Sequence, residues 1–160
     1  MTASAVPYKG IFQLQSARDL VSKARHDIER LRSDPVDAYA AFDFFVTIRH
    51  VPDWLYPSEP KKRDRLFSKH VELRICRHLA DGAKHFEARH PRHKQVAGTL
   101  KSSGAWGDAW AKGVWKPGVW GDGLFISLDP RDIDTKALGN RINALALAER
   151  TLAIVEKAVI

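Results

Sequence analysis

Apolar residues recur at helical spacing in four parts of the chain. The first part follows Ser16, which opens a capping box, and its pattern predicts a helix over residues 16–33. Asp34 and Pro35 are typical of the N-cap and the first turn of a second helix, over residues 35–56. Because this second helix is apolar almost all round, we expect it in the centre of the core.

The second and third helices each contain a residue that disfavours helical structure. Pro52 predicts a kink, followed by a turn or short helical piece and by a connection, KKRDR. The third helix is predicted over residues 66–88, where Gly82 indicates a break or the close approach of another backbone. Cys76 and Phe86 fall on its inner apolar stripe, so we interpret Cys76 as a small buried hydrophobe.

The last third of the chain combines turn-forming residues, tryptophans and strand-like segments. A basic, turn-prone stretch predicts a loop over residues 89–104. A Trp-rich, partly β insertion follows over about 104–142, in which the run LFISL and a second short strand or turn near Arg141 predict a short hairpin. Asn143 then caps a last helix over residues 143–159.

These elements define a mainly α fold, a helical bundle of four main helices with the Trp-rich insertion before the last helix. A chain of 160 residues, of which 44% are hydrophobic, can bury a core as a single domain over residues 1–160. No basic leader precedes an apolar run, and no stretch approaches the roughly 20 apolar residues of a membrane span. We therefore expect a cytoplasmic protein with no membrane partner.

The positive charge of the chain is concentrated in its middle. The net charge is +7, and residues 61–101 hold 12 Lys or Arg against 4 Asp or Glu, so the rest of the chain sums to −1. A local basic patch on a balanced domain is typical of a protein that binds a phosphate backbone. A solvated helix face followed by a basic loop explains the same charge.

The second helix carries a stripe of polar residues on its otherwise apolar surface. Asp43, Thr47 and His50 are spaced i, i+4 and i+7, which places them on one side of a helix. A buried carboxylate or imidazole needs a partner. The stripe is therefore either part of a site or a hydrogen-bonded network that holds neighbouring helices in register.

The third helix carries a second polar face, which is basic and rich in histidine. A guanidinium binds phosphate through two hydrogen bonds, and an imidazole exchanges protons near neutral pH, so this face suits a phosphodiester. A face that only contacts water is the alternative. The residues on this face are Arg74, Arg77, His78, Asp81, Lys84 and His85.

The histidines of the third helix do not match a known metal motif. His78, Asp81 and His85 share a helix face, and the sequence alone leaves open whether they bind a metal. No HExxH motif or paired CxxC motif occurs, and signatures of phosphate loops, dinucleotide sites and α/β-hydrolase nucleophiles are also missing. We therefore expect neither a metal nor a cofactor.

Four tryptophans lie among glycines in the insertion. Such residues can stack on bases. Their spacing beside apolar residues favours a place in the core or at an interface with a protein partner. The four residues are Trp106, Trp110, Trp115 and Trp120.

Two segments of the chain, AFDFFVTIRHVPDW and CRHLADGAKHF, are similar to segments of a group of uncharacterised bacterial and phage-borne proteins. That group has an FFVT-x-x-H-x-x-DW stretch and a later C-R-x-I/L-A-x-G-x-KH stretch. Its helical layout resembles the HEPN superfamily, helical bundles that are often RNA-cleaving toxins or defence effectors. HEPN proteins dimerise around a motif of Arg, four to six residues, and His. Here seven residues separate Arg77 from His85, and four separate Arg65 from His70.

The resemblance and the basic segment lead to our first hypothesis, an RNA-directed HEPN-like protein. Its specific form is a metal-independent ribonuclease of a toxin or anti-phage defence system. In it Arg77 and Lys84 bind phosphate, and His85 acts as acid or base. His50 and Asp43 orient the imidazole across the helix pair. The resemblance implies a homodimer. The RNA-binding residues are Arg74, Arg77, Lys84, Arg89, Arg92 and Lys94.

The second hypothesis is a non-enzymatic helical interaction module or phage accessory protein. In this interpretation the four tryptophans of the insertion bind a protein partner, and the basic face only keeps the protein in solution. The geometry of Arg and His on the third helix separates the two hypotheses, because chemistry requires these groups on one concave surface.

Overall fold

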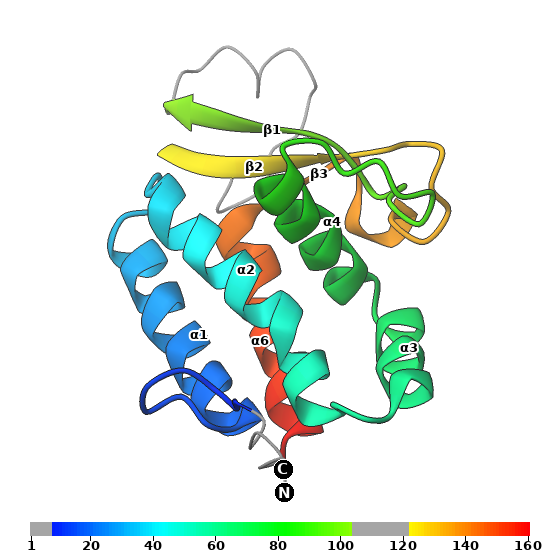
Figure 1. Ribbon diagram of the computed structural model, residues 1–160. Helices are drawn as coiled ribbons and strands as arrows, with labels where there is room; N and C mark the ends of the chain where they lie inside the picture. The colour runs from blue at the N-terminus through cyan, green and yellow to red at the C-terminus, as the bar shows by residue number, and fades with distance from the viewer. Residues whose placement is uncertain (1–7, 104–121) are drawn as a thin grey trace, which may run out of the picture.

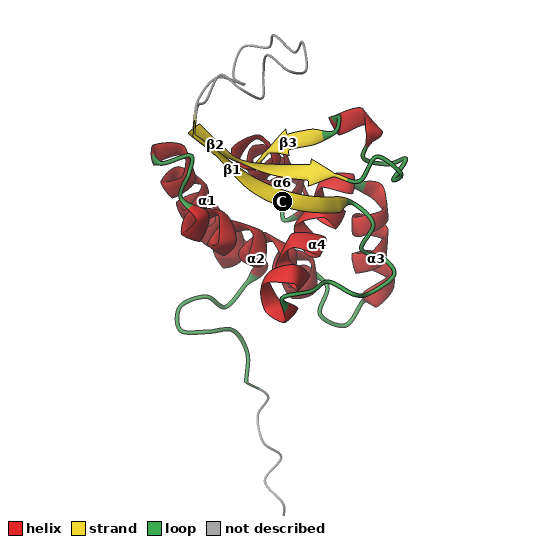
Figure 2. Ribbon diagram, turned by 90° about the horizontal axis from the view of Figure 1, so that it is seen from above, coloured by secondary structure: helices red, strands yellow, loops and turns green. Residues whose placement is uncertain are grey.

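The computed structural model describes residues 8–103 and 122–160, which form a mainly helical fold with a small antiparallel sheet. In Figure 1 the sheet lies across one end of the helices, and Figure 2 shows the sheet from above with the helices beneath it. The mainly α fold with strands before the last helix agrees with the sequence analysis. No helix in the described ranges is both long and apolar enough to cross a membrane.

Helix α1, Ala17–Ser33, agrees with the predicted helix at both ends. The Ser16 hydroxyl accepts a hydrogen bond from the Asp19 backbone N–H at 3.2 Å, and the Asp19 carboxylate accepts one from the Ser16 N–H at 2.8 Å. This capping box satisfies two N–H groups that the first turn of a helix leaves unpaired. The apolar side of α1 packs against α2 and α6.

Helix α2, Ala38–Leu55, begins later than predicted because its N-cap is Asp37. The Asp37 carboxylate accepts hydrogen bonds at 2.9 and 3.0 Å from the N–H groups two and three residues further on. The prediction that Asp34 caps this helix is therefore wrong. Asp34 instead follows the last residue of α1, and its carboxylate accepts the Val36 N–H at 3.2 Å in the turn between the two helices.

Helix α2 continues through Pro52 to Leu55, so the proline does not end the helix. A proline inside a helix removes one hydrogen bond and costs about 3 kcal/mol when nothing compensates. Here Ile48 and Val51 are completely buried, and Pro52 itself is buried. Burial of an aliphatic side chain contributes about 1.5–3 kcal/mol, so packing on this turn offsets the lost hydrogen bond.

The predicted third helix is two helices, α3 at Pro60–Lys69 and α4 at Val71–His85. The chain is extended at His70 between them, with φ −127° and ψ 110°. The KKRDR segment is not a connection but part of α3, whose first residue is a proline at a position that needs no N–H. Arg74 Nη1 donates to two carbonyl groups in the last turn of α3, at 2.9 and 2.7 Å, and this stabilises the break.

Gly82 lies inside α4, and neither of its predicted effects occurs. The helix continues past it, and a Cβ at this position would meet no neighbouring element within 4 Å. The prediction for Cys76 is confirmed, because its side chain is completely buried and its Sγ lies 3.5 Å from the Thr151 Oγ1. Burial raises the pKa of the Cys76 thiol to about 12, so the thiol stays protonated at neutral pH.

The sheet contains β1 (Val96–Ser103), β2 (Asp122–Leu128) and β3 (Arg141–Asn143), in that order, with a 3₁₀ turn η1 (Lys136–Leu138) between the last two. Strands β2 and β3 confirm the predicted LFISL strand and the second short strand. Strand β1 corrects the predicted loop over 89–104, because it pairs with β2 along its length. Its own residues are mostly small or polar, so the partner strand decides its conformation.

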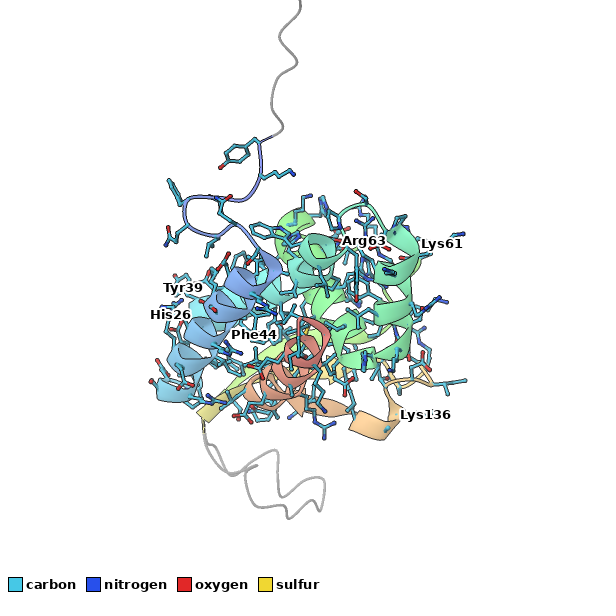
Figure 3. The ribbon with its side chains drawn as sticks, turned by 90° about the horizontal axis from the view of Figure 1, so that it is seen from below. His26, Tyr39, Phe44, Lys61, Arg63 and Lys136 are labelled. Atoms are coloured by element: carbon cyan, nitrogen blue, oxygen red, sulfur yellow. The ribbon has the colours of Figure 1, made fainter. Side chains whose placement is uncertain are left out.

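Helix α6, Ala144–Ala158, agrees with the predicted last helix and has the predicted cap. The Asn143 Oδ1 accepts two backbone N–H groups of the first turn at 2.9 and 3.2 Å. Within residues 8–103 and 122–160, one cluster of buried side chains joins the five described α helices to the sheet. Phe44 is completely buried in this cluster and meets Phe45 edge to face at 5.5 Å (Figure 3).

Replacement of Asp37 by alanine tests the cap of α2. We expect Asp37→Ala to lower the free energy of unfolding by about 1 kcal/mol, because two N–H groups of the first turn lose their acceptor. Urea unfolding followed by circular dichroism measures the change. Asp34→Ala is the matched control and should change stability by less than about 0.5 kcal/mol. Equal losses in the two variants would contradict the assignment of Asp37 as the cap.

Candidate nucleic-acid interface

A loop of residues 86–95, which we call the basic loop, joins α4 to β1. Residues 90–93 in the second half of this loop form a turn, in which the His93 N–H donates to the His90 carbonyl at 2.9 Å. Pro91 occupies the second position of this turn, where its fixed φ is favourable. The Arg92 N–H donates to the His90 Nδ1 at 3.2 Å, so neutral His90 carries its proton on Nε2.

Asp81 of α4 anchors the basic loop to the helical bundle. Its Oδ2 accepts hydrogen bonds from the Arg92 Nη2 at 3.0 Å and from the His93 Nε2 at 2.7 Å. Its Oδ1 lies 3.9 Å from the Arg49 Nε of α2. Burial of Asp81 opposes ionisation, but the hydrogen bond from Arg92 and the charge of Arg49 outweigh burial and lower its pKa. Asp81 is therefore an anion that holds two residues of the loop.

Two histidines in contact, with their rings tilted by 32°, link α4 to the start of β1. The rings of His78 and His93 lie 4.8 Å apart, and the His78 Nδ1 accepts the Val96 N–H at 3.2 Å. Burial and the neighbouring His93 lower the pKa of His78 to about 4. Burial also lowers the pKa of His93, although the hydrogen bond to Asp81 opposes this shift. Both imidazoles are therefore neutral near pH 7, and His78 can accept the strand's N–H.

Arginines from α2 and α4 meet over a buried ring of α3. The Arg77 guanidinium lies 4.4 Å and the Arg49 guanidinium 5.7 Å from the centre of the Phe67 ring. Burial, with repulsion from Arg92 and Arg49, lowers the pKa of Arg77 to about 10, so it stays charged at neutral pH. The Nε atoms of Arg49 and Arg77 are buried and have no hydrogen-bond partner within residues 8–103 and 122–160. The Arg49 Nη1 nevertheless pairs with Asp53 at 2.7 Å, so part of this positive charge is neutralised within the fold.

A hollow of about 450 Å³ lies at the end of α4, where the basic loop begins. Two histidines, an arginine and a phenylalanine are exposed around it, together with one glutamate that pairs with the arginine. Among the described residues, the His85 side chain forms no hydrogen bond and no ion pair, so its imidazole is available to a ligand. The residues that line the hollow are His85, Phe86, Glu87, Arg89 and His90.

The polar stripe of α2 is not part of this hollow. Asp43 pairs with Arg30 of α1 at 2.7 Å. The Thr47 hydroxyl lies 3.4 Å from the carboxylate of Asp27, which is also on α1 and is buried. His50 lies 3.4 Å from Asp53 on its own helix. Within the described ranges no hydrogen bond or ion pair joins Asp43 or His50 to His85. The stripe therefore forms contacts between α1 and α2 and within α2. This agrees with the alternative that the stripe is a polar network between neighbouring helices.

The residues predicted to bind RNA fall into two groups. Arg74 is directed into the fold, because besides the end of α3 it pairs with Asp134 at 2.8 Å. Arg77 lies half-buried against Phe67, and Arg92 is exposed while bound to Asp81. The remaining three predicted residues are exposed on α4 and the basic loop: Lys84, Arg89 and Lys94.

Sequence reasoning misses three residues of the hollow, Phe86, Glu87 and His90, and the first and last are missed for different reasons. Phe86 occupies the inner stripe of the predicted helix, but the helix ends before it, and its side chain is 94% exposed. No local signal separates such a residue from a core phenylalanine. His90 is one of several histidines in the segment, and it lines the hollow as the first residue of the turn that contains Pro91. The proline after His90 is the signal that could have indicated that turn.

The sequence left open whether His78, Asp81 and His85 bind a metal, and it predicted a partner surface on the four tryptophans. No three His, Cys, Asp or Glu side chains come together as a metal site in the part of the chain that the structure describes. Trp106, Trp110, Trp115 and Trp120 lie outside the described residues. An apolar groove of about 350 Å³ lies between the sheet and helices α2 and α4, and its lining includes Lys101 of β1.

Comparison with protein-family models, with curated proteins and with solved structures gave no match. The class of protein is therefore defined by the structure alone. It is a mainly helical fold with a three-stranded antiparallel sheet, and it carries a basic loop anchored by one carboxylate.

The neutral His78 makes stability depend on pH. Its pKa of about 4 in the folded protein lies below the ordinary value of 6.5, so the unfolded chain takes up a proton first as the pH falls. We expect the free energy of unfolding to decrease from pH 6.5 to pH 4, and to decrease less in His78→Gln. Urea unfolding at four pH values between 7.5 and 4 measures this.

His26, which is exposed on α1 (Figure 3), provides the matched control for this experiment. His26→Gln should keep the pH dependence of the unaltered protein. If His78→Gln and the unaltered protein lose stability in parallel over this interval, His78 is not the group that excludes the proton.

Proposed function

We propose that this protein is RNA-directed and cleaves RNA without a metal ion, at the hollow formed by the end of α4 and the basic loop. One observation carries the proposal: His85, His90 and Arg89 line the same concave surface. Imidazole and guanidinium groups on one surface are what a metal-independent reaction on a phosphodiester requires. Lys84 at the end of α4 and Lys94 in the basic loop are exposed and add positive charge.

The reaction is transesterification within the RNA chain. His85 accepts the proton of a 2′-hydroxyl, and the 2′-oxygen forms a bond to the adjacent phosphorus. The bond from phosphorus to the 5′-oxygen breaks, and protonated His85 returns its proton to that oxygen. The products are a 2′,3′-cyclic phosphate and a 5′-hydroxyl. Arg89 binds the non-bridging oxygens, where charge develops in the transition state.

His90 acts as a hydrogen-bond donor in this proposal. Because its Nδ1 accepts the Arg92 N–H, its Nε2–H remains for a phosphate oxygen. Asp81 holds Arg92 and His93 and thereby positions the turn that carries His90. Asp81 is thus a positioning residue, while His85 and Arg89 contact the substrate.

The proposed ribonuclease is related to HEPN proteins. The two segments that resemble the bacterial and phage-borne group lie on α2 and α4, which pack against each other. The helical bundle and the basic face of α4 support a HEPN-like assignment and, with it, a homodimer. A role in a toxin or anti-phage defence system follows from the same resemblance.

Cleavage of a mixed RNA pool by the purified protein tests the proposed activity. We expect fragments with 2′,3′-cyclic phosphate ends in the presence of a chelator. His85→Ala should reduce the rate at least about 100-fold, the usual contribution of a general acid or base. His90→Ala should reduce the rate less, because it removes only a hydrogen bond.

His26→Ala is the control for loss of an exposed histidine outside the hollow, and it should cleave at the unaltered rate. Circular dichroism of each variant separates a catalytic loss from unfolding. RNA that stays intact at a high excess of protein would contradict the ribonuclease and favour the interaction module. In that case Trp115→Ala and Trp120→Ala should abolish binding of a protein partner.

A further inference from the structure

Phe86 combines near-complete exposure with an unfavourable backbone conformation. Its side chain is 94% exposed, and its φ of 65° and ψ of −41° are close to those of a strained γ-turn. Residues other than glycine rarely adopt a positive φ, and they keep one only where the surroundings impose it. The ring buries almost nothing in the fold, so packing of its own side chain does not compensate for this conformation.

The surroundings of Phe86 explain how the conformation is imposed. The residue ends α4 and begins the basic loop, whose other end is held by the bonds from Arg92 and His93 to Asp81. The chain must therefore turn sharply at Phe86 to reach this anchor. Glycine would make the same turn without strain, so the presence of an aromatic ring here requires another reason.

The groups next to the ring indicate what it contacts. His85, Arg89 and His90 line the same hollow, and Lys84 is exposed on the preceding turn. Arg89 pairs with Glu87, but an apolar protein surface would still have to bury this ion pair, the two imidazoles and the Lys84 ammonium. A nucleotide instead presents a flat base for the ring and a phosphate for the cations.

We propose that Phe86 is a stacking platform for one unpaired RNA base, and that it makes the hollow specific for single-stranded RNA. This inference rests on the proposed RNA-directed function and names its substrate class. In a duplex each base is already stacked and paired, so its face is not accessible to a side chain at the surface. A single strand can turn a base onto the ring while Arg89 binds the adjacent phosphate.

Binding of a labelled 12-nucleotide RNA with 2′-O-methyl groups tests the platform, because this RNA cannot be cleaved through a 2′-hydroxyl. Fluorescence anisotropy gives Kd for the single strand and for the same sequence in a duplex. We expect tighter binding of the single strand, and we expect Phe86→Ala to weaken it about tenfold. Binding of the duplex should change little. Phe86→Trp should retain the affinity for the single strand, since indole also stacks.

Phe12 is the matched control, because it too is highly exposed (86%) and has a positive φ of 49°. It lies in the N-terminal segment and does not line the hollow. Phe12→Ala should therefore leave both dissociation constants unchanged. Phe86→Gly should weaken binding as Phe86→Ala does while raising the urea midpoint, because glycine relieves the strain.

The outcomes separate this inference from the function on which it rests. If the unaltered protein binds neither single-stranded nor duplex RNA, both fail. If it binds RNA and Phe86→Ala binds equally well, or if the duplex binds more tightly, RNA-directed function stands and the platform is wrong. A tenfold loss confined to the single strand, with Phe12→Ala unchanged, supports the platform.

Discussion

Burial of α2 is the constraint on which the rest of the structure depends. This helix is apolar almost all round, and Ala40, Phe44, Ile48 and Val51 are completely buried. It therefore needs apolar neighbours on several sides, which α1, α4 and α6 provide. Packing of α4 against α2 directs the apolar side of α4 inward and leaves its charged side at the basic loop.

The same packing brings opposite charges together at the edge of the core. The Arg49 side chain extends from α2 to Asp81 of α4. The Arg77 guanidinium lies over the Phe67 ring of α3. Asp81 is the carboxylate that holds the loop, yet it faces three arginines and a neutral histidine. Asp53 pairs with Arg49 at 2.7 Å, so a second carboxylate also balances the arginines at this edge of the core.

The chain keeps chemically different histidines in one segment. His78 and His93 are withdrawn from solvent and remain neutral, so they serve as hydrogen-bonding parts of the fold. His85 and His90 face solvent at the hollow. Histidines close in sequence therefore differ in burial and in hydrogen bonding, which sequence spacing does not reveal.

Local signals in the sequence determine the helices that have strong caps. Ser16 with Asp19 marks the start of α1, and Asn143 marks the start of α6, because each cap is made by hydrogen bonds to the N–H groups immediately following. The buried Cys76 and the strand LFISL also follow from local patterns. In these cases the interacting groups are close in sequence, so the spacing of residue types contains the information.

Long-range contacts decide the remaining features. Pro52 stays within a helix because the turn around it is buried, and β1 is a strand because β2 pairs with it. The break at His70 and the exposure of Phe86 depend on where α3 and the basic loop dock, and Asp81 sets the latter through Arg92 and His93. The sequence by itself determined the capped helices, the basic segment and the residue types available for chemistry. Only the tertiary structure decided which of those residues share a surface, because their partners lie far away along the chain.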